Sequence, residues 1–232
     1  MLRLETLGGL VLACDSGTPL PIQRRRLALL ALLATAGKRG VRREKLTAVL
    51  WPDNPDAKAR HALEQLIYSI RQERDEPLVV GPDPLRINHH VLTVDVVEFE
   101  SAVERGALDE AVRVYRGPFL EGFYLSGAPE FESWSETERG RLAGRYRAAL
   151  ERLAGEYADR RDFGGAVEMW RRLVAADPLS TSAALGLMRG LAAQGDRSGA
   201  WQHGKAHEGL VRRELGRDPD PALRSLMAEL AS

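Results

Sequence analysis

Apolar residues alternate with other residues near the start of the chain and recur at helical spacing afterwards. The alternating pairs, spaced by two as in half-buried strands, are Leu2 with Leu4, Leu10 with Leu12, and Leu20 with Ile22. These pairs predict a small antiparallel sheet. The pattern then changes and predicts helices over Arg24–Ala36 and Arg43–Leu50, with a short strand near Val41 between them.

The next segment, Pro55–Arg74, has the two faces of an amphipathic helix. Its apolar residues recur at steps of three and four and share one arc of a helical wheel: Ala59, Leu63, Leu66, Ile67 and Ile70. The rest of the wheel collects side chains that suit base edges and phosphates, with Glu64 as the one acid among them. These are Lys58, Arg60, His61, Gln65, Tyr68, Ser69, Arg71 and Gln72. From the helix alone, an ordinary solvated surface is an equally good interpretation.

A hairpin is expected after this helix. Leu78–Val80 and Leu85–Val94 predict two strands, and the turn between them, residues 81–84, contains glycine and two prolines. A small sheet, three helices and a hairpin form a winged helix, whose third helix enters the major groove while the hairpin, or wing, contacts the DNA backbone. Arg86 lies on the wing and is the expected phosphate contact there. His89 and His90 could add to it, but adjacent strand residues point to opposite faces.

The second half of the chain has the pattern of helical repeats. Small residues and large aromatics occur at the spacing of a tetratricopeptide repeat of about 34 residues, namely Leu153, Ala154, Tyr157, Ala166, Trp170 and Pro178. Weaker copies contain Leu187, Gly195 and Ala200 downstream and Gly106, Ala111 and Tyr115 upstream, with a long helix from Pro129 to about Ala149. The chain is therefore predicted to be mainly α. A winged-helix domain (1–95) precedes an all-α domain of tetratricopeptide-like repeats (96–232).

Charge is distributed unevenly between these halves. Lys plus Arg equals Asp plus Glu at 33 each over the whole chain, which by itself argues against a nucleic-acid partner. Between Leu20 and Arg74, however, twelve basic residues face five acidic ones, a net charge of +7 around the amphipathic helix. From Val96 onward, 19 basic residues meet 22 acidic ones. The first half therefore has the charge expected for contact with DNA.

Other features argue against catalysis, metals and cofactors. The sequence lacks the phosphate loop, the nucleophile elbow of hydrolases and the HExxH zinc motif, so we expect no enzyme. Its single cysteine, Cys14, excludes an intramolecular disulfide and fits a reducing cytoplasm. His203 and His207 have the spacing of two metal ligands without an evident third, so solvated surface positions are expected. Trp134 and Trp170 are expected in the core. The N-terminus does not resemble a signal peptide, and no apolar run is long enough for a membrane span.

With both halves considered, the chain resembles the SARP-type bacterial transcriptional regulators, which join an OmpR-like winged helix to a bacterial transcriptional activator domain of tetratricopeptide type. In the first half the likeness rests on Leu46–Asp53, Ala59–His61, Leu66, Ile70–Arg71, Val94–Asp95 and Glu98–Phe99. In the second half it rests on Tyr115, Gly117–Phe123, Phe131–Trp134, Glu138–Arg139, Asp177–Leu179, Leu187–Met188 and Leu215–Gly216.

This resemblance implies a transcription activator that binds double-stranded DNA at short direct repeats as a head-to-tail pair and contacts RNA polymerase. His61, Gln65, Ser69 and Arg71 match the base- and phosphate-reading positions of OmpR-like recognition helices. Arg42, Arg43 and Lys45, at the start of the preceding helix, would hold phosphate or face the polymerase. The resemblance implies no cofactor, no metal and no membrane association.

Two points remain open at the level of sequence. Gly204 stands where such domains carry an aromatic residue, so a packing gap and a loose final repeat are expected, and Ser180–Ser182 replace usual acidic residues. The alternative function is a protein–protein adaptor whose winged helix no longer binds DNA, since winged helices and helical repeats also serve in protein contacts. The local net charge of +7 favours the DNA-binding activator.

Overall fold

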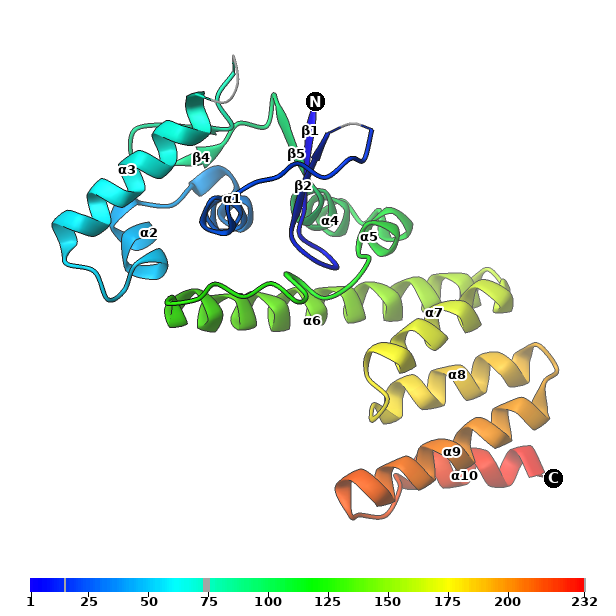
Figure 1. The fold of residues 1–232 in the computed structure, drawn as a ribbon. Coiled ribbons are helices and arrows are strands. Elements are labelled where there is room, and N and C mark those ends of the chain that lie inside the picture. Colours follow the sequence, from blue (N-terminus) through cyan, green and yellow to red (C-terminus); the bar gives the residue numbers. More distant parts are fainter. Residues whose placement is uncertain (15, 73–75, 232) are drawn as a thin grey trace. The chain divides into compact units, whose positions relative to one another are not determined.

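The computed structural model describes residues 1–14, 16–72 and 76–231, and of Gln72 it describes the backbone alone. The chain divides into two compact units, Met1–Gly144 and Arg145–Ser232, and each is described here by itself. A small sheet and helices make up the first unit, and the described part of the second is helical (Figure 1). The predicted mainly α fold class, with a small sheet region ahead of an all-helical domain, is thereby confirmed.

The N-terminal sheet has three strands in the order β2-β1-β5. Their bounds are Leu2–Glu5 for β1, Val11–Cys14 for β2 and Leu92–Val94 for β5. β2 pairs with β1 antiparallel, as predicted, but β5 pairs with β1 in parallel, and Leu4 aligns with both Leu12 and Val94. The predicted strand at Leu20 and Ile22 is wrong: Leu20 donates one hydrogen bond to Leu12, and the prolines at 19 and 21 have no N–H to continue a ladder.

Three α-helices, one short 3-10 helix and a short hairpin complete the winged-helix region. Their bounds are Arg24–Ala36 (α1), Gly37–Arg39 (the 3-10 helix η1), Arg43–Leu50 (α2), Asp56–Gln72 (α3), Val79–Val80 (β3) and Arg86–Ile87 (β4). The predictions for α1 and α2 are confirmed to the residue, and Val41 forms an isolated bridge to Leu85. α3 is described to Gln72, and residues 73 and 74 of the prediction lie outside the described part. The predicted second hairpin strand divides at Asn88 into β4 and β5, because Leu92 N–H returns to the Asn88 carbonyl in a turn.

The first unit extends beyond the predicted domain boundary at residue 95. It includes α4 (Asp95–Glu104), α5 (Leu108–Val114) and the start of α6 (Pro129–Asp159). The buried carboxylate of Asp95 accepts hydrogen bonds from the N–H groups of Thr6 and Leu7, which ties α4 to the end of β1. Burial raises the pKa of this carboxyl, although the same hydrogen bonds act in the opposite direction.

Aromatic residues after α5 pack into one cluster in the first unit. Phe131 lies 5.1 Å from Trp134 and 5.9 Å from Phe123, measured between ring centroids, and Phe119 meets Trp134 edge-on at 5.8 Å. Arg139 of α6 donates to the Phe119 carbonyl at 2.9 Å and holds the segment between α5 and α6 in place. Trp134 therefore serves packing, as the sequence predicted, rather than a ligand cage.

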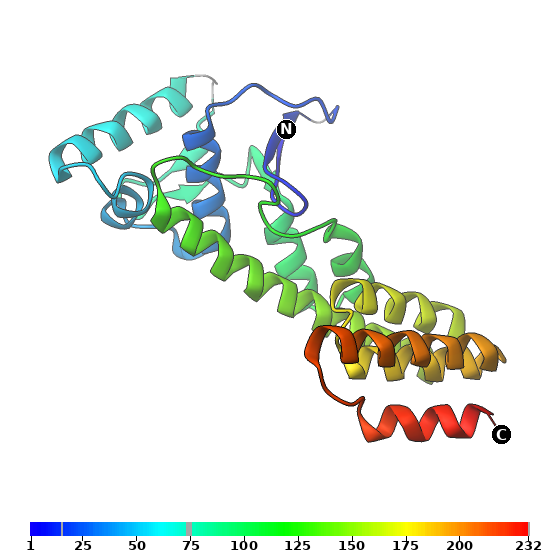
Figure 2. The ribbon, with the colours of Figure 1, turned by 60° about the horizontal axis from the view of Figure 1, so that its bottom comes forward.

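The second unit contains the end of α6 and four further helices. These are α7 (Phe163–Ala176), α8 (Thr181–Ala193), α9 (Arg197–Leu215) and α10 (Pro221–Ala231). α7 packs against α8 and α8 against α9, while α10 lies beside α9 and also reaches α8 (Figure 2). The Trp170 ring lies on Gly186 of α8, where a Cβ atom would approach ring atom Cε3 to 2.6 Å. A large aromatic opposite a small residue thus joins α7 to α8.

Two expectations for α9 are wrong. Gly204 leaves no packing gap: it is buried, and Met188 of α8 and Met227 of α10 fill the space that an aromatic would occupy. His207 is buried at 4 % exposure and His203 is half-buried, and Nε2 of both rings lacks a hydrogen-bond partner among the described residues. The imidazole of His207 is therefore a core side chain, and that of His203 is partly covered.

Candidate nucleic-acid interface

Helix α3 is anchored by its apolar arc. The Pro55 carbonyl accepts from the N–H groups of Lys58 at 2.9 Å and Ala59 at 3.0 Å, which starts the helix. All five predicted core residues are buried, with exposures of 8 % or less: Ala59, Leu63, Leu66, Ile67 and Ile70. Because these side chains lie on one arc against α2 and β3, the opposite arc must face outward.

The outward arc consists of the residues that the sequence singled out. Lys58, Arg60, His61, Gln65, Tyr68 and Arg71 are all exposed. Tyr68 is 66 % exposed, which is unusual for a large aromatic and leaves its ring and hydroxyl available for contact. Ser69 is half-buried and its hydroxyl donates to the Leu66 carbonyl at 2.7 Å. The side chain of Gln72 lies outside the described residues.

Two pairs of side chains interact along this arc. The Nε2 atoms of His61 and Gln65 lie 2.9 Å apart, one helical turn from each other. Arg60 lies 3.7 Å from Asp56 in a solvent-exposed ion pair, which contributes little to stability and leaves the guanidinium accessible. The arc is therefore rich in donors that are not tied to the core.

The wing is held against both α2 and α3. Arg71 at the end of α3 donates to the Gly81 carbonyl at 3.5 Å, and Nε of Arg43 donates to the Pro82 carbonyl at 2.7 Å. Nε of Arg86 donates to the Lys38 carbonyl at 2.9 Å, so this arginine spans from β4 to η1. Gly40, with φ +67°, permits this approach, since a Cβ there would overlap the Leu85 carbonyl. Arg43 and Arg86 thus hold the wing as well as carrying charge.

A basic hollow of about 490 Å³ lies where α1, η1 and α2 meet. Arg42 and Lys45, both predicted site residues, line it and are exposed. Arg39 lines it too, although the sequence analysis counted this residue in the local charge without singling it out. The run of cations at 38, 39, 42, 43 and 45 was the signal that pointed to it. Three cations around one hollow suit a phosphate group.

Part of the local positive charge has a structural role instead. The Arg24 guanidinium lies 4.5 Å from the Phe123 ring centroid and donates to the Tyr124 carbonyl at 2.6 Å. Arg25 lies over the Trp51 ring at 5.5 Å. Such cation–π contacts hold the loop after α5 and the end of α2 to the start of α1. The net charge of +7 is therefore divided between packing and the exposed surface.

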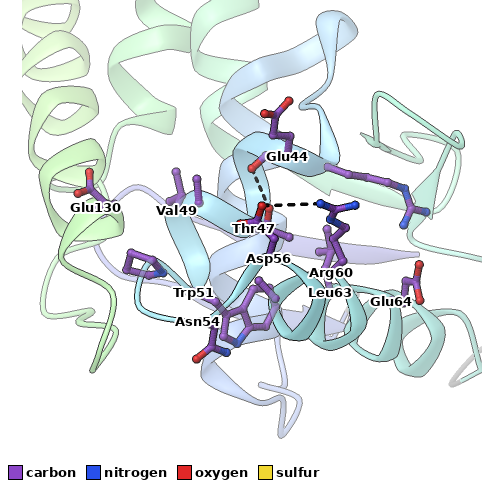
Figure 3. A pocket seen from close by; sticks show the side chains of 14 residues that line it. Glu44, Thr47, Val49, Trp51, Asn54, Asp56, Arg60, Leu63, Glu64 and Glu130 are labelled. Atoms are coloured by element: carbon purple, nitrogen blue, oxygen red, sulfur yellow. Dashed lines mark hydrogen bonds and ion pairs between the residues drawn. The ribbon is translucent and has the colours of Figure 1, made fainter.

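A second hollow, of about 770 Å³, lies between α2 and the first turns of α3 (Figure 3). Val49, Trp51, Pro52, Ala59 and Leu63 supply apolar lining. Glu44, Asp56, Glu64 and Glu130 add carboxylates, and Arg60 points toward Asp56 in the close view. With its mixture of apolar surface and negative charge, this hollow suits a protein side chain better than a phosphate.

Residues 1–14, 16–72 and 76–231 contain no group of three or more His, Cys, Asp or Glu side chains placed to hold a metal ion. Within the same ranges, no helix combines the length and apolar character that a membrane crossing requires.

The fold and this surface define a class of protein: a helix-presenting α+β unit followed in the same chain by packed helical hairpins, the architecture of a transcription regulator. Residues 94–231 match the family model described as "Bacterial transcriptional activator domain", and the chain belongs to this family. The chain is accordingly a SARP-type regulator of transcription and not an enzyme.

A solved structure shares the fold over nearly the whole chain. It is described as "Mycobacterium tuberculosis EmbR in complex with low affinity phosphopeptide". The TM-score is 0.69 at 20 % sequence identity, and the match covers 99 % of this chain and 65 % of that chain. This chain therefore spans just under two thirds of the protein that it resembles. Comparison with curated protein sequences gives no match.

Proposed function

We propose that this protein is a sequence-specific DNA-binding transcription activator whose helix α3 enters the major groove. The observation that carries the proposal is the division of α3 into a fully buried apolar arc and an exposed arc of donors. A helix fixed on one side presents its other side rigidly, which base reading requires. We assign residues 1–95 to DNA binding and 96–232 to the activator domain, and the family match beginning at residue 94 supports this division.

The proposed contact residues divide into two roles. His61, Gln65 and Ser69 lie along the middle of the arc and would meet base edges, where bidentate side chains distinguish base pairs. The remaining proposed contacts would meet phosphates, which fix register and orientation without reading sequence. These are Lys58, Arg60, Tyr68, Arg71 and Gln72 on α3, Arg42, Arg43 and Lys45 on α2, and Arg86 on the wing.

The proposal includes two protein contacts. The activator domain would support self-association as a head-to-tail pair on direct repeats and contact with RNA polymerase, as the family resemblance implies. We place a polymerase contact on the hollow between α2 and α3, because Glu44, Glu64 and Glu130 would repel a DNA backbone. A regulator that works in this way acts in the cytoplasm.

The adaptor alternative has one observation in its favour, which is the same hollow between α2 and α3 with its apolar lining. It predicts protein binding without DNA binding. Sequence-specific binding would exclude it, since an adaptor has no need of base-reading side chains.

Fluorescence anisotropy with labelled promoter fragments tests the two functions. The full chain should bind fragments containing its direct repeats, at least a thousandfold more tightly than unrelated DNA, by the order of magnitude usual for specific binders. Affinity should fall steeply as salt rises, because bound phosphates release counterions. Gln65→Ala should reduce discrimination at one base position by about 1–3 kcal/mol, with Arg160→Ala, at an exposed turn position just after α6, as control. Binding that ignores both salt and sequence would reject the activator, and the absence of DNA binding would favour the adaptor.

A further inference from the structure

His61 and Gln65 form a hydrogen-bonded pair in the middle of the exposed arc of α3. Their two Nε2 atoms lie 2.9 Å apart, and both side chains are exposed. An amide nitrogen acts as a donor and not as an acceptor, so the imidazole Nε2 accepts this bond and the ring proton lies on Nδ1. The imidazole ring therefore determines which end of the amide faces outward.

We propose that His61 is a positioning residue for Gln65, and that protonation of His61 changes the base that Gln65 prefers. The inference rests on the proposed function of α3. When His61 is neutral, Gln65 uses one N–H on the imidazole and keeps its carbonyl oxygen and its second N–H free. Adenine presents a donor at N6 beside an acceptor at N7, which this free acceptor and donor match. The neutral pair therefore prefers adenine.

Protonation removes this arrangement. An imidazolium carries hydrogen on both nitrogens, so Nε2 of His61 no longer accepts a bond from Gln65. The amide must turn over so that its Oε1 accepts from the imidazolium, and its NH₂ group then points outward. Guanine presents acceptors at both O6 and N7, which a donor edge matches. The protonated pair therefore prefers guanine.

Among the groups around His61, the Gln65 amide is the one expected to respond to protonation of the imidazole. On α3, Lys58 precedes His61 by three residues and Glu64 follows it by three, so the nearest helical neighbours carry opposite charges. α2, which packs against α3, contributes Arg43 and Glu44, and these line the hollow on the side of Arg60 and Glu64. β3, the other packed element, consists of two valines. The hydrogen bond of the imidazole goes to Gln65.

Nuclear magnetic resonance of the full chain without DNA tests the pair itself. Long-range proton–nitrogen spectra should show the Nδ1–H tautomer of His61 at pH 8. The side-chain amide signals of Gln65 should differ between pH 8 and pH 5.5, and the variant His61→Leu should abolish that difference. His89→Leu, which removes an exposed turn histidine, is the control and should leave it intact. An Nε2–H tautomer at pH 8, or Gln65 signals that ignore His61→Leu, would overturn the inference.

Selection from a randomised duplex pool at pH 8 and pH 5.5 tests the consequence for recognition. One position should favour adenine at pH 8 and guanine at pH 5.5, with the ratio changing by about tenfold in the wild-type protein. His61→Leu should show the same base at both pH values, while the control His89→Leu should retain the change. A base preference that ignores pH in the wild type, or a change that persists in His61→Leu, contradicts the proposal. Failure to enrich any sequence at either pH would instead reject DNA recognition itself, even if the resonance data confirm the pair.

Discussion

The carboxylate of Asp95 lies 2.6 Å from the hydroxyl of Thr6, although 89 residues separate the two in sequence. Asp95 also accepts from the Thr6 N–H, at 2.8 Å and 2.9 Å to its two oxygens, and from the Leu7 N–H at 2.9 Å. A single buried side chain thus satisfies backbone donors where β1 ends and where α4 begins. This bond network connects the N-terminal sheet to the helix that opens the activator-family match.

Removal of the Asp95 carboxylate should destabilise the first unit. Asp95→Ala leaves the Thr6 and Leu7 N–H groups buried without an acceptor, so the free energy of unfolding should fall by about 3 kcal/mol. Urea unfolding followed by tryptophan fluorescence measures this change. Asp53→Asn, at an exposed position between α2 and α3, should stay within about 0.5 kcal/mol of wild type. A loss for Asp95→Ala as small as that of the control would show that the network adds nothing to stability.

Substitution by alanine should reduce stability by different amounts at Gly186 and at Gly204 of the second unit. At Gly186 the new methyl group meets the rigid ring of Trp170, so Gly186→Ala should cost about 2 kcal/mol or more. At Gly204 it meets the flexible side chains of Met188 and Met227, 2.9 Å away. A gain in helix propensity of about 1 kcal/mol should offset much of that strain. Gly204→Ala should therefore remain within about 1 kcal/mol of wild type.

Gly155→Ala in α6 is the matched control for both glycines. Its Cβ meets nothing within 4 Å, so it should stabilise the chain by about 0.5–1 kcal/mol. Thermal unfolding of the three variants measures their order of stability, which should be Gly155→Ala, then Gly204→Ala, then Gly186→Ala. Equal costs for Gly186→Ala and Gly204→Ala would contradict the distinction between the rigid ring and the flexible methionines.

Acid should weaken the packing of α9. Burial, with a smaller contribution from the charge of His207, lowers the pKa of His203 in the folded protein. A folded-state pKa below the unfolded value of about 6.5 means that the unfolded chain binds the proton more readily. The stabilisation from neutral His203 is therefore present above that value and is lost as the pH falls through the folded-state pKa.

Urea unfolding at pH 7.5 and pH 5.0 measures this effect. Because His203 is half-buried, the loss attributable to it should be below about 1 kcal/mol. His203→Leu should reduce the difference between the two pH values, whereas His89→Leu at an exposed turn should not. The prediction is wrong if both variants respond to acid like the wild type.

The basic hollow should contribute affinity without specificity. Arg42→Ala and Lys45→Ala should each weaken binding to all DNA sequences similarly, and each lost phosphate contact should flatten the slope of log affinity against log salt by about 0.9. Arg39→Ala should behave in the same way, because this side chain lines the same hollow. Anisotropy titrations at four salt concentrations measure the slopes, with Arg160→Ala as control. Altered base preference in any of the three variants would contradict a pure phosphate role.

Periodicity alone predicted helices α1, α2 and α3 and the two faces of α3. Local spacing suffices there, since apolar residues three and four apart must share a side of any helix. The same spacing identified which residues from Lys58 to Arg71 are exposed. Charge counting located the basic region, but it did not distinguish Arg24 and Arg25, which pack on aromatic rings, from Arg39, which faces a hollow.

Long-range pairing was decided by the tertiary structure alone. The parallel partnership of β5 with β1, the acceptor role of Asp95, and the filling of the space at Gly204 by two methionines each join residues distant in sequence. No local pattern encodes such contacts, because each depends on which surfaces meet once the helices and strands have formed. The burial of His207 and the partial burial of His203 likewise depend on how the helices of the second unit pack, which the sequence of α9 by itself could not reveal.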